Sequence, residues 1–101
     1  MTEHQIIDYR IKQLLYQMQD GKCAYCGQHR NHKYMTVDHI IPLSKGGTES
    51  LKNLQCTCKK CNRLKDDMLP HEFTKFIRNI LKNSINIEKR LKINNNIFSP
   101  F

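Results

Sequence analysis

A chain of 101 residues has room for one domain with a small core, and domains of this size often need a metal or a disulfide for stability. Its formal net charge of +8 favours a polyanionic partner such as nucleic acid, although a Lys-rich solubility surface has the same composition. No apolar stretch approaches the roughly 18 residues of a membrane span, and the N-terminus lacks the pattern of a secretory signal, so we expect a cytoplasmic protein with no membrane partner.

The first expected element is a helix over residues 4–20. Its apolar residues recur at helical spacing and would share one face: Ile7, Ile11, Leu14, Leu15 and Met18. Thr2 and Gln5 have the spacing of an N-terminal capping box, and Gly21 suits the left-handed residue that follows a last turn. A tight CAYCG turn and a polar, basic loop come next.

Two short strands are expected after this loop. Aromatic and β-branched residues favour a strand over residues 34–41, which Pro42 would end, and a second strand over residues 53–58. The connection between them has a loop-like composition, with two glycines at its centre.

Helices are expected over the rest of the chain. Residues 59–67 have helix-forming composition, and Pro70 suits the first turn of another helix. That second helix would run to Asn83, and its apolar stripe consists of Phe73, Phe76, Ile77, Ile80 and Leu81. Beyond Asn83 the helical signal weakens, and we expect residues 93–101 to be frayed.

Five cysteines occupy positions 23, 26, 56, 58 and 61. In a reducing compartment, pairs separated by two residues indicate metal knuckles before disulfides, and an odd total argues against a pure disulfide framework. Cys23, Cys26, Cys58 and Cys61 would therefore supply the four thiolates of a structural zinc site, with no position left for a catalytic water. The alternative, that all are merely buried thiols, is disfavoured by two matched pairs. We exclude Cys56 because a CxC pair makes a poorer knuckle and because Cys56 would face inward on its strand.

The segment between the two knuckles resembles a known family. From Cys23 to Lys65 it reads C-x-x-C, D-H-I-I-P-L-S-x-G-G, N-L-Q and C-x-x-C-N-x-x-K. This order is similar to the ββα-metal finger of HNH endonucleases, in the subgroup with a four-cysteine zinc site. The resemblance implies an α+β fold in a single HNH nuclease domain over residues 1–101. Its zinc-bound ββα core would span residues 22–69, flanked by the N-terminal helix and by a C-terminal helical tail over residues 70–92.

The same resemblance implies roles for four residues of the core. His39 would be the general base, and Asn53 would hydrogen-bond backbone across the loop and hold the shape of the finger. Asp38 and Asn62 would bind the catalytic ion through carboxylate and amide oxygens. Because Asn62 stands where many members have His, the chain carries an H-N-N variant of the motif.

The chemistry of these residue types is consistent with such roles. A neutral imidazole can take a proton from water, and one carboxylate with one amide oxygen forms a hard site that favours Mg²⁺ or Mn²⁺. Asp38 and His39 would point to opposite sides of a regular strand, so a shared site needs a twist or a strand end there. Among the nearby cations, we expect phosphates of DNA to meet Lys60, Arg63 and Lys65.

The leading hypothesis is a metal-dependent DNA endonuclease that nicks or cuts duplex DNA, in restriction, phage or mobile-element functions. Besides DNA, a second copy of the chain or a larger DNA-processing protein is an expected partner. The alternative is a non-catalytic zinc-ribbon module that binds nucleic acid, which would have no need of Asp38, His39 and Asn62 together. A third hypothesis, a helical scaffold whose zinc finger only folds the chain, fits the basic tail but not these three residues.

Overall fold

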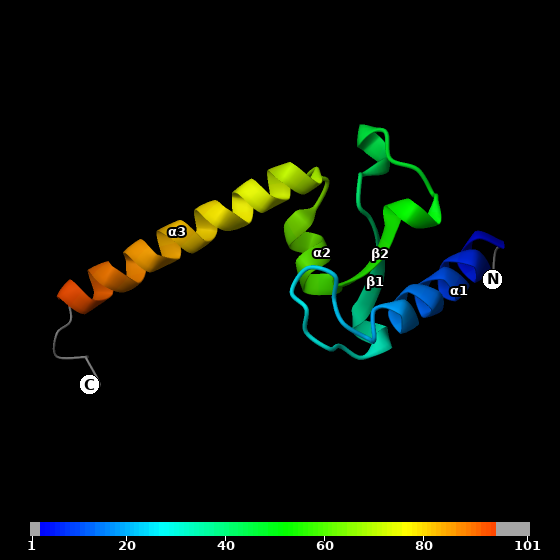
Figure 1. Ribbon diagram of the computed structural model, residues 1–101, viewed down its shortest axis with the longest axis horizontal. Coiled ribbons are helices and arrows are strands. Elements are labelled where there is room, and N and C mark those ends of the chain that lie inside the picture. Colours follow the sequence, from blue (N-terminus) through cyan, green and yellow to red (C-terminus); the bar gives the residue numbers. More distant parts are fainter. Residues whose placement is uncertain (1–2, 95–101) are drawn as a thin grey trace. The chain divides into compact units, whose positions relative to one another are not determined.

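The computed structural model describes residues 3–94, with side chains from Tyr9 to Lys92. Its α-helices and β-strands are, in order, α1 (Glu3–Met18), β1 (Met35–His39), β2 (Leu54–Cys58), α2 (Lys59–Lys65) and α3 (Pro70–Asn94) (Figure 1). Three single-turn 3₁₀ helices lie in the loops, at His32–Tyr34, Leu43–Lys45 and Leu51–Asn53. The chain divides into two compact units, the first ending at Pro70 and the second beginning at His71. Among the described residues, no helix combines the length and the apolar character needed to cross a bilayer.

The α+β class expected from the sequence is confirmed, with differences in the extent of its elements. α1 ends at Met18 and α2 at Lys65, each two residues before its predicted end. β1 stops at His39, before the predicted end of the strand at residue 41. The last helix does not weaken beyond Asn83 but continues unbroken to Asn94. Because residues 71–94 contain neither Gly nor Pro, their modest helix propensities are enough to extend it. Residues 95–101 of the segment expected to be frayed lie outside the described part of the chain.

The end of α1 is held against β2 by one glutamine. The amide of Gln19 accepts a hydrogen bond from Cys56 N–H at 2.8 Å and donates one to Cys56 O at 2.9 Å. The turn after it needs left-handed backbone, with φ of 52° at Asp20 and 71° at Gly21. Gly21 therefore fills the role predicted for it, and the chain turns sharply towards the first CxxC pair.

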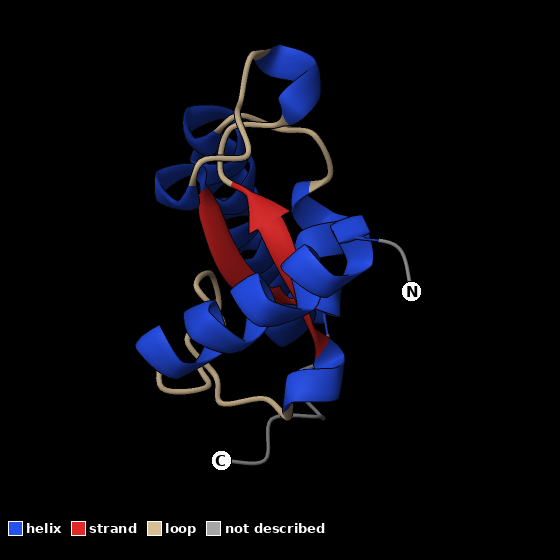
Figure 2. Cartoon of the chain, turned by 90° about the vertical axis from the view of Figure 1, so that its right-hand side faces the viewer, coloured by secondary structure: helices blue, strands red, loops and turns tan. Residues whose placement is uncertain are grey.

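The two strands form an antiparallel hairpin, drawn in red in Figure 2. In its register Met35 pairs with Cys58, Asp38 with Gln55, and His39 with Leu54. Both α1 and α2 pack on this hairpin, and they lie on opposite sides of it in Figure 1. The main core is small and combines apolar and sulfur side chains: Leu15, Cys23, Met35, Leu54, Cys56 and Cys58.

Candidate functional site

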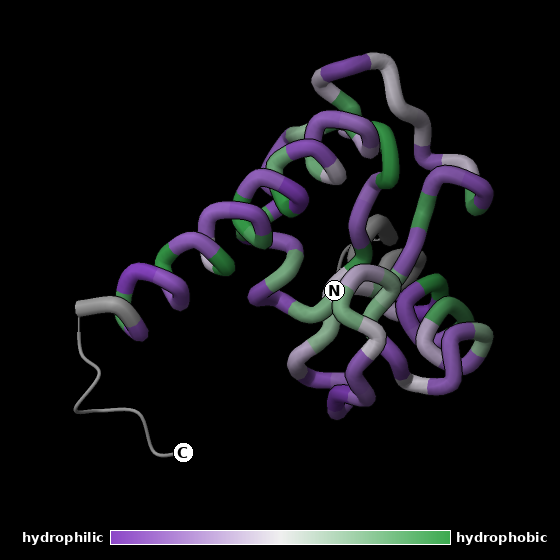
Figure 3. Tube along the Cα trace, turned by 60° about the vertical axis from the view of Figure 1, so that its left-hand side comes forward, coloured by the Kyte–Doolittle hydropathy of each residue, from purple (hydrophilic) through white to green (hydrophobic). Residues whose placement is uncertain are grey.

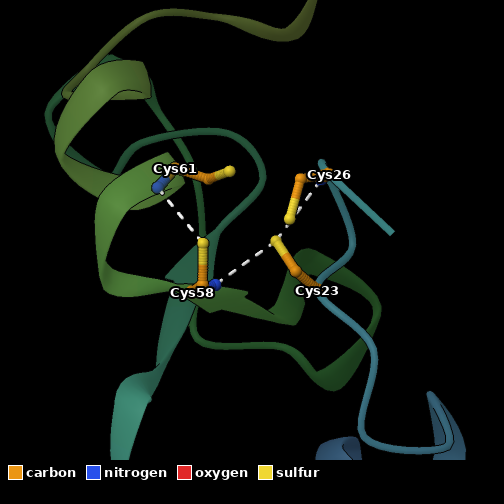
Figure 4. Close-up of side chains that lie close together, drawn as sticks. All are labelled: Cys23, Cys26, Cys58 and Cys61. Carbon is orange, nitrogen blue, oxygen red and sulfur yellow. Dashed lines mark hydrogen bonds between the residues drawn. The ribbon is translucent and has the colours of Figure 1, made fainter. Parts of the chain in front are cut away.

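Four cysteine side chains converge between the first knuckle and the start of α2. Figure 4 shows Cys23 and Cys26 on one loop, facing Cys58 and Cys61 at the junction of β2 and α2. Their sulfurs all lie within 4.8 Å of one another. Four convergent thiol groups with no other ligand type match a tetrahedral structural zinc site.

Backbone N–H groups prepare this cluster for a cation. Burial alone would raise the pKa of the Cys23 thiol, but the N–H groups of Cys58, Cys26 and Tyr25 donate to its sulfur and bring its pKa down to about 7. Burial raises the pKa of Cys61, helped by its hydrogen bond with the Cys58 sulfur. At least one thiol is thus close to ionising near neutral pH, as metal binding requires.

The fifth cysteine stays apart from this cluster. Cys56 is fully buried in the core, its sulfur lies 3.7 Å from Lys12 O, and burial raises the pKa of its thiol. A protonated, buried thiol behaves as a small apolar side chain. The structure therefore brings together the four cysteines expected as ligands and leaves Cys56 to packing.

The three residues expected at the catalytic centre line one open cavity of about 270 Å³. Asp38 and His39 come from the end of β1 and Asn62 from the middle of α2. Because β1 ends at His39, the strict alternation of a strand does not keep the two neighbours on opposite sides. Two carboxylates that no sequence motif indicates, Asp66 and Asp67, line the same cavity just after α2.

A buried ion pair closes one wall of this cavity. Lys65 Nζ lies 2.8 Å from Asp38 Oδ1 and 3.0 Å from Oδ2, and it also donates to the carbonyl of His39. The side chains of Lys65 and Asp38 are only 1% and 6% exposed. The prediction that Lys65 meets DNA phosphates does not match this position, because packing of α2 on β1 turns its ammonium inward.

The two carboxylate oxygens of Asp38 accept different numbers of hydrogen bonds, and Oδ1 has the fewer donors. Oδ2 accepts hydrogen bonds from Lys65, from Gln55 at 3.0 Å and from Tyr25 at 3.3 Å, whereas Lys65 is the donor found on Oδ1 among the described residues. A carboxylate has about four lone-pair positions. Asp38 and Asn62 line one cavity, and carboxylate and amide oxygens are donor types that suit Mg²⁺, which usually takes one or two protein oxygens and keeps several waters.

The imidazole of His39 lies between two cavities. One is the cavity shared with Asp38; the other lies beside α1 and is also lined by Glu49. His39 Nε2 is itself buried and 3.3 Å from Glu49 Oε2, although the two atoms are not aligned for a hydrogen bond. Glu49 belongs to the loop between the strands, and its distance from His39 in sequence gave no signal of this contact.

Asn53 closes the loop between β1 and β2. Its Oδ1 accepts from Ile41 N–H at 2.9 Å, and its Nδ2 donates to Ile41 O at 3.0 Å and to Thr48 O at 2.8 Å. The Asn53 side chain thus forms hydrogen bonds with the backbone on both sides of the loop, as expected from the sequence. Gly47 makes this close approach possible, since an added Cβ would lie 1.8 Å from Ile41 O.

A basic groove runs along the other side of α2. Lys60 and Arg63, both expected to meet phosphates, are exposed and line a cavity of about 360 Å³. Lys59, Tyr34, Arg30 and Cys58 also line it, and none of the described residues contributes a carboxylate. The Nε of Arg30 is buried without a hydrogen-bond partner. This groove was only partly foreseen, because Arg30 is remote from α2 in sequence.

The sequence of this chain matches the model of a known protein family. The family model described as HNH endonuclease matches residues 23–77, more than half of the chain. The chain belongs to the HNH endonuclease family. The matched segment contains both cysteine pairs and all the residues that line the cavity around Asp38.

HNH relatives include proteins much longer than this chain. This chain is 32% identical over 62 residues to the type IV methyl-directed restriction enzyme EcoKMcrA of Escherichia coli, and the match covers 55% of this chain and 22% of that enzyme. It is 38% identical over 50 residues to the CRISPR-associated endonuclease Cas9 of Corynebacterium diphtheriae, covering 48% of this chain and 5% of the relative. The crystal structure of the type II-C Cas9 enzyme of Actinomyces naeslundii matches with a TM-score of 0.54 and 28% identity, over 58% of this chain and 6% of that one. The chain therefore spans less than a quarter of these relatives.

The four-cysteine assignment predicts different effects for two serine substitutions. We expect Cys23→Ser to lower the zinc content below the wild-type value of about one ion per chain and to destabilise the fold, because metal binding contributes folding free energy. Cys56→Ser should retain the zinc, although it places a hydroxyl in the core. Elemental analysis with thermal unfolding measures both. Equal zinc loss in the two variants would contradict the assignment.

The buried ion pair predicts a large loss of stability for Lys65→Met. Removal of one partner leaves the Asp38 charge buried and costs about 3–5 kcal/mol. Denaturant unfolding of the zinc-loaded protein measures the change, with the exposed Lys60→Met as the matched control. Adding Asp38→Asn should recover part of the loss, whereas additive costs in the double variant would show that the two side chains are not coupled.

Because the Asn53 side chain both donates and accepts hydrogen bonds in this loop, we expect that Asn53→Asp is not a conservative change. The variant keeps an acceptor for Ile41 N–H but loses both donors, and it sets a carboxylate against two carbonyl oxygens, so we expect a cost of about 2 kcal/mol or more. Hydrogen exchange at the Ile41 amide should accelerate. Asn31→Asp is the control, because Asn31 Oδ1 only accepts from Lys33 N–H. Similar behaviour of the two variants would exclude the donor role of Asn53.

Proposed function

We propose that this HNH chain is a metal-dependent endonuclease that hydrolyses phosphodiester bonds of DNA, with His39 as the general base. The observation that carries this proposal is the single cavity lined by Asp38, His39 and Asn62, three side chains that a zinc-binding scaffold does not need together. A non-catalytic zinc-ribbon module would keep the cysteine cluster without such a cavity. Membership of the HNH family supports the catalytic alternative.

The contact with Glu49 suggests which nitrogen of His39 acts as the base. Nε2 is buried next to a carboxylate oxygen, an environment that favours a proton on this nitrogen. Nδ1 then carries the free lone pair, and the imidazole lines the cavity where the substrate would bind. Glu49 is a positioning residue in this scheme, because it acts through His39.

The reaction is a balanced hydrolysis. The oxygen of a water molecule forms a bond to phosphorus while the bond from phosphorus to a sugar oxygen breaks. His39 takes one proton from the attacking water, and the departing sugar oxygen gains one from solvent. A divalent ion such as Mg²⁺ or Mn²⁺, held by Asp38 Oδ1 and Asn62, would stabilise negative charge on the phosphate. The nearby Asp66 and Asp67 would add to the negative potential that attracts such an ion.

The basic groove of Lys60, Arg63 and Arg30 supports DNA as the substrate. Exposed cations that line one groove can neutralise successive backbone phosphates without reading sequence. The relatives are a restriction enzyme and CRISPR-associated endonucleases, much longer proteins that this chain matches only in part. We therefore also propose a second copy or a larger DNA-processing protein as a partner, in the reducing cytoplasm that zinc-bound thiols require.

A plasmid nicking assay with added Mg²⁺ or Mn²⁺ tests this function. We expect His39→Ala to reduce the cleavage rate by about 10²–10⁴-fold, the usual contribution of a general base, while zinc content and the unfolding temperature stay at wild-type values. His71→Ala, which removes an exposed histidine outside the cavity, is the matched control. If the His39 variant cleaves at the wild-type rate, His39 is not the base. If the wild type binds DNA but never cleaves it with either ion, the zinc-ribbon alternative is correct.

A further inference from the structure

The helix α3 has two opposite faces. At 100° per residue, five of its large apolar side chains fall on one side: Phe73, Ile77, Ile80, Ile87 and Leu91. Phe76 lies at the edge of that face, and Leu81 and Ile85 lie outside it. Figure 3 shows the corresponding alternation of hydrophilic and hydrophobic segments along this helix. The helix also carries six Lys and Arg residues and two Glu residues, so its charge is strongly positive.

Four of the six cations form a line on the face opposite the apolar one. We name this line the α3 ridge: Lys75, Arg78, Lys82 and Lys89. Helical geometry places all four within roughly 60° of one another and extends them over roughly 21 Å of the helix axis. Each of the four side chains is exposed.

The ridge carries no compensating carboxylate. Glu72 and Glu88, the two acidic residues of α3, lie roughly 90° or more around the helix from its centre. In the part of the chain that the structure describes, no ion pair involves a ridge residue. The four positive charges therefore remain available to an external anion.

We propose that the α3 ridge binds the phosphate backbone of duplex DNA without reading its sequence. This inference rests on the proposed nuclease function, which supplies DNA as the polyanion. A duplex carries one negative charge per roughly 1.7 Å of its axis, so a length equal to the ridge presents on the order of a dozen phosphate charges. A straight line of cations fits such a periodic polyanion better than it fits a compact anion.

An anionic membrane surface fits the same helix less well. A helix that lies in a membrane interface buries its apolar face, and its cations reach the lipid phosphates from the edges of that face. The ridge lies on the opposite side, so its cations would point away from the lipid. Phe73, at the start of the apolar face, is moreover 6% exposed and hence not available to lipid.

The salt dependence of DNA binding tests the ridge. The probe is a fluorescently labelled duplex longer than α3, titrated with the full zinc-loaded chain without added Mg²⁺ or Mn²⁺. In a variant with Lys75→Gln, Arg78→Gln, Lys82→Gln and Lys89→Gln, we expect weaker binding and a slope of log K against log salt that is smaller by about 3 to 4. Gln preserves helix propensity, and circular dichroism verifies the helix content. An unchanged slope overturns the proposal.

A permuted variant separates the ridge from net charge. Arg78→Asn with Asn79→Arg, and Lys82→Asn with Asn83→Lys, keep the composition and the charge but rotate two cations by roughly 100° around the helix. We expect a slope between those of the wild type and the neutralised variant. Binding equal to wild type would mean that only total charge matters, and the ridge would be rejected.

Two further measurements distinguish other outcomes. Vesicles of phosphatidylglycerol are sedimented with the wild-type chain and the neutralised variant. Loss of vesicle binding in the variant, with its DNA binding intact, would identify a membrane surface and overturn the proposal. The binding titration contains no added divalent ion, so it measures DNA affinity without cleavage. A failure of the nuclease proposal would therefore appear in the cleavage assay, whereas a failure of the ridge proposal would appear in the binding assay.

Discussion

A single ammonium group connects the end of α2 to the end of β1. Lys65 binds both oxygens of Asp38 and the carbonyl of His39, 27 and 26 residues away in sequence. The other end of the same seven-residue helix is held by its cysteines, since Cys58 caps α2 and faces the first knuckle. Because both ends of α2 are fixed, Asn62 in its middle is directed into the cavity of Asp38 and His39. The polar site thus depends on one buried charge pair and one sulfur cluster.

The loop between the strands supplies the second constraint. The Asn53 side chain holds the backbone of Ile41, two residues after His39, and of Thr48, which precedes Glu49. This one amide therefore links the segment of the expected base to the segment of the acid beside it. Close approach at Gly47 leaves no space for a side chain there. The loop is accordingly a rigid support for the imidazole, not only a connection between strands.

The two compact units carry different parts of the proposed function. The proposed metal ligands, the proposed base and the basic groove all belong to the unit that ends at Pro70, whereas the α3 ridge belongs to the unit that begins at His71. The HNH match covers the first unit from Cys23 and only the first residues of the second. Family membership therefore supports the proposed catalytic site, whereas the proposed DNA contact of α3 rests on the residues of this helix alone. Such an arrangement would let polyanion affinity change without any change in the catalytic site.

Features that need only near neighbours could be predicted from the sequence. The two CxxC pairs and the amphipathic helices were sufficient for the α+β class and for the four expected zinc ligands, because each of these patterns depends on spacing over a few positions. The order of the D-H, N and N motifs, through its resemblance to HNH endonucleases, also indicated Asp38, His39 and Asn62, but not Asp66 and Asp67 of the same cavity. The inward turn of Lys65, the contact of Glu49 with His39 and the arrival of Arg30 beside α2 depended on the tertiary structure. In sequence, Lys65 is one cation in a basic run. Only the packing of α2 against β1 removes its ammonium from water and gives it a carboxylate partner, since contacts across such separations leave no local periodicity in the chain.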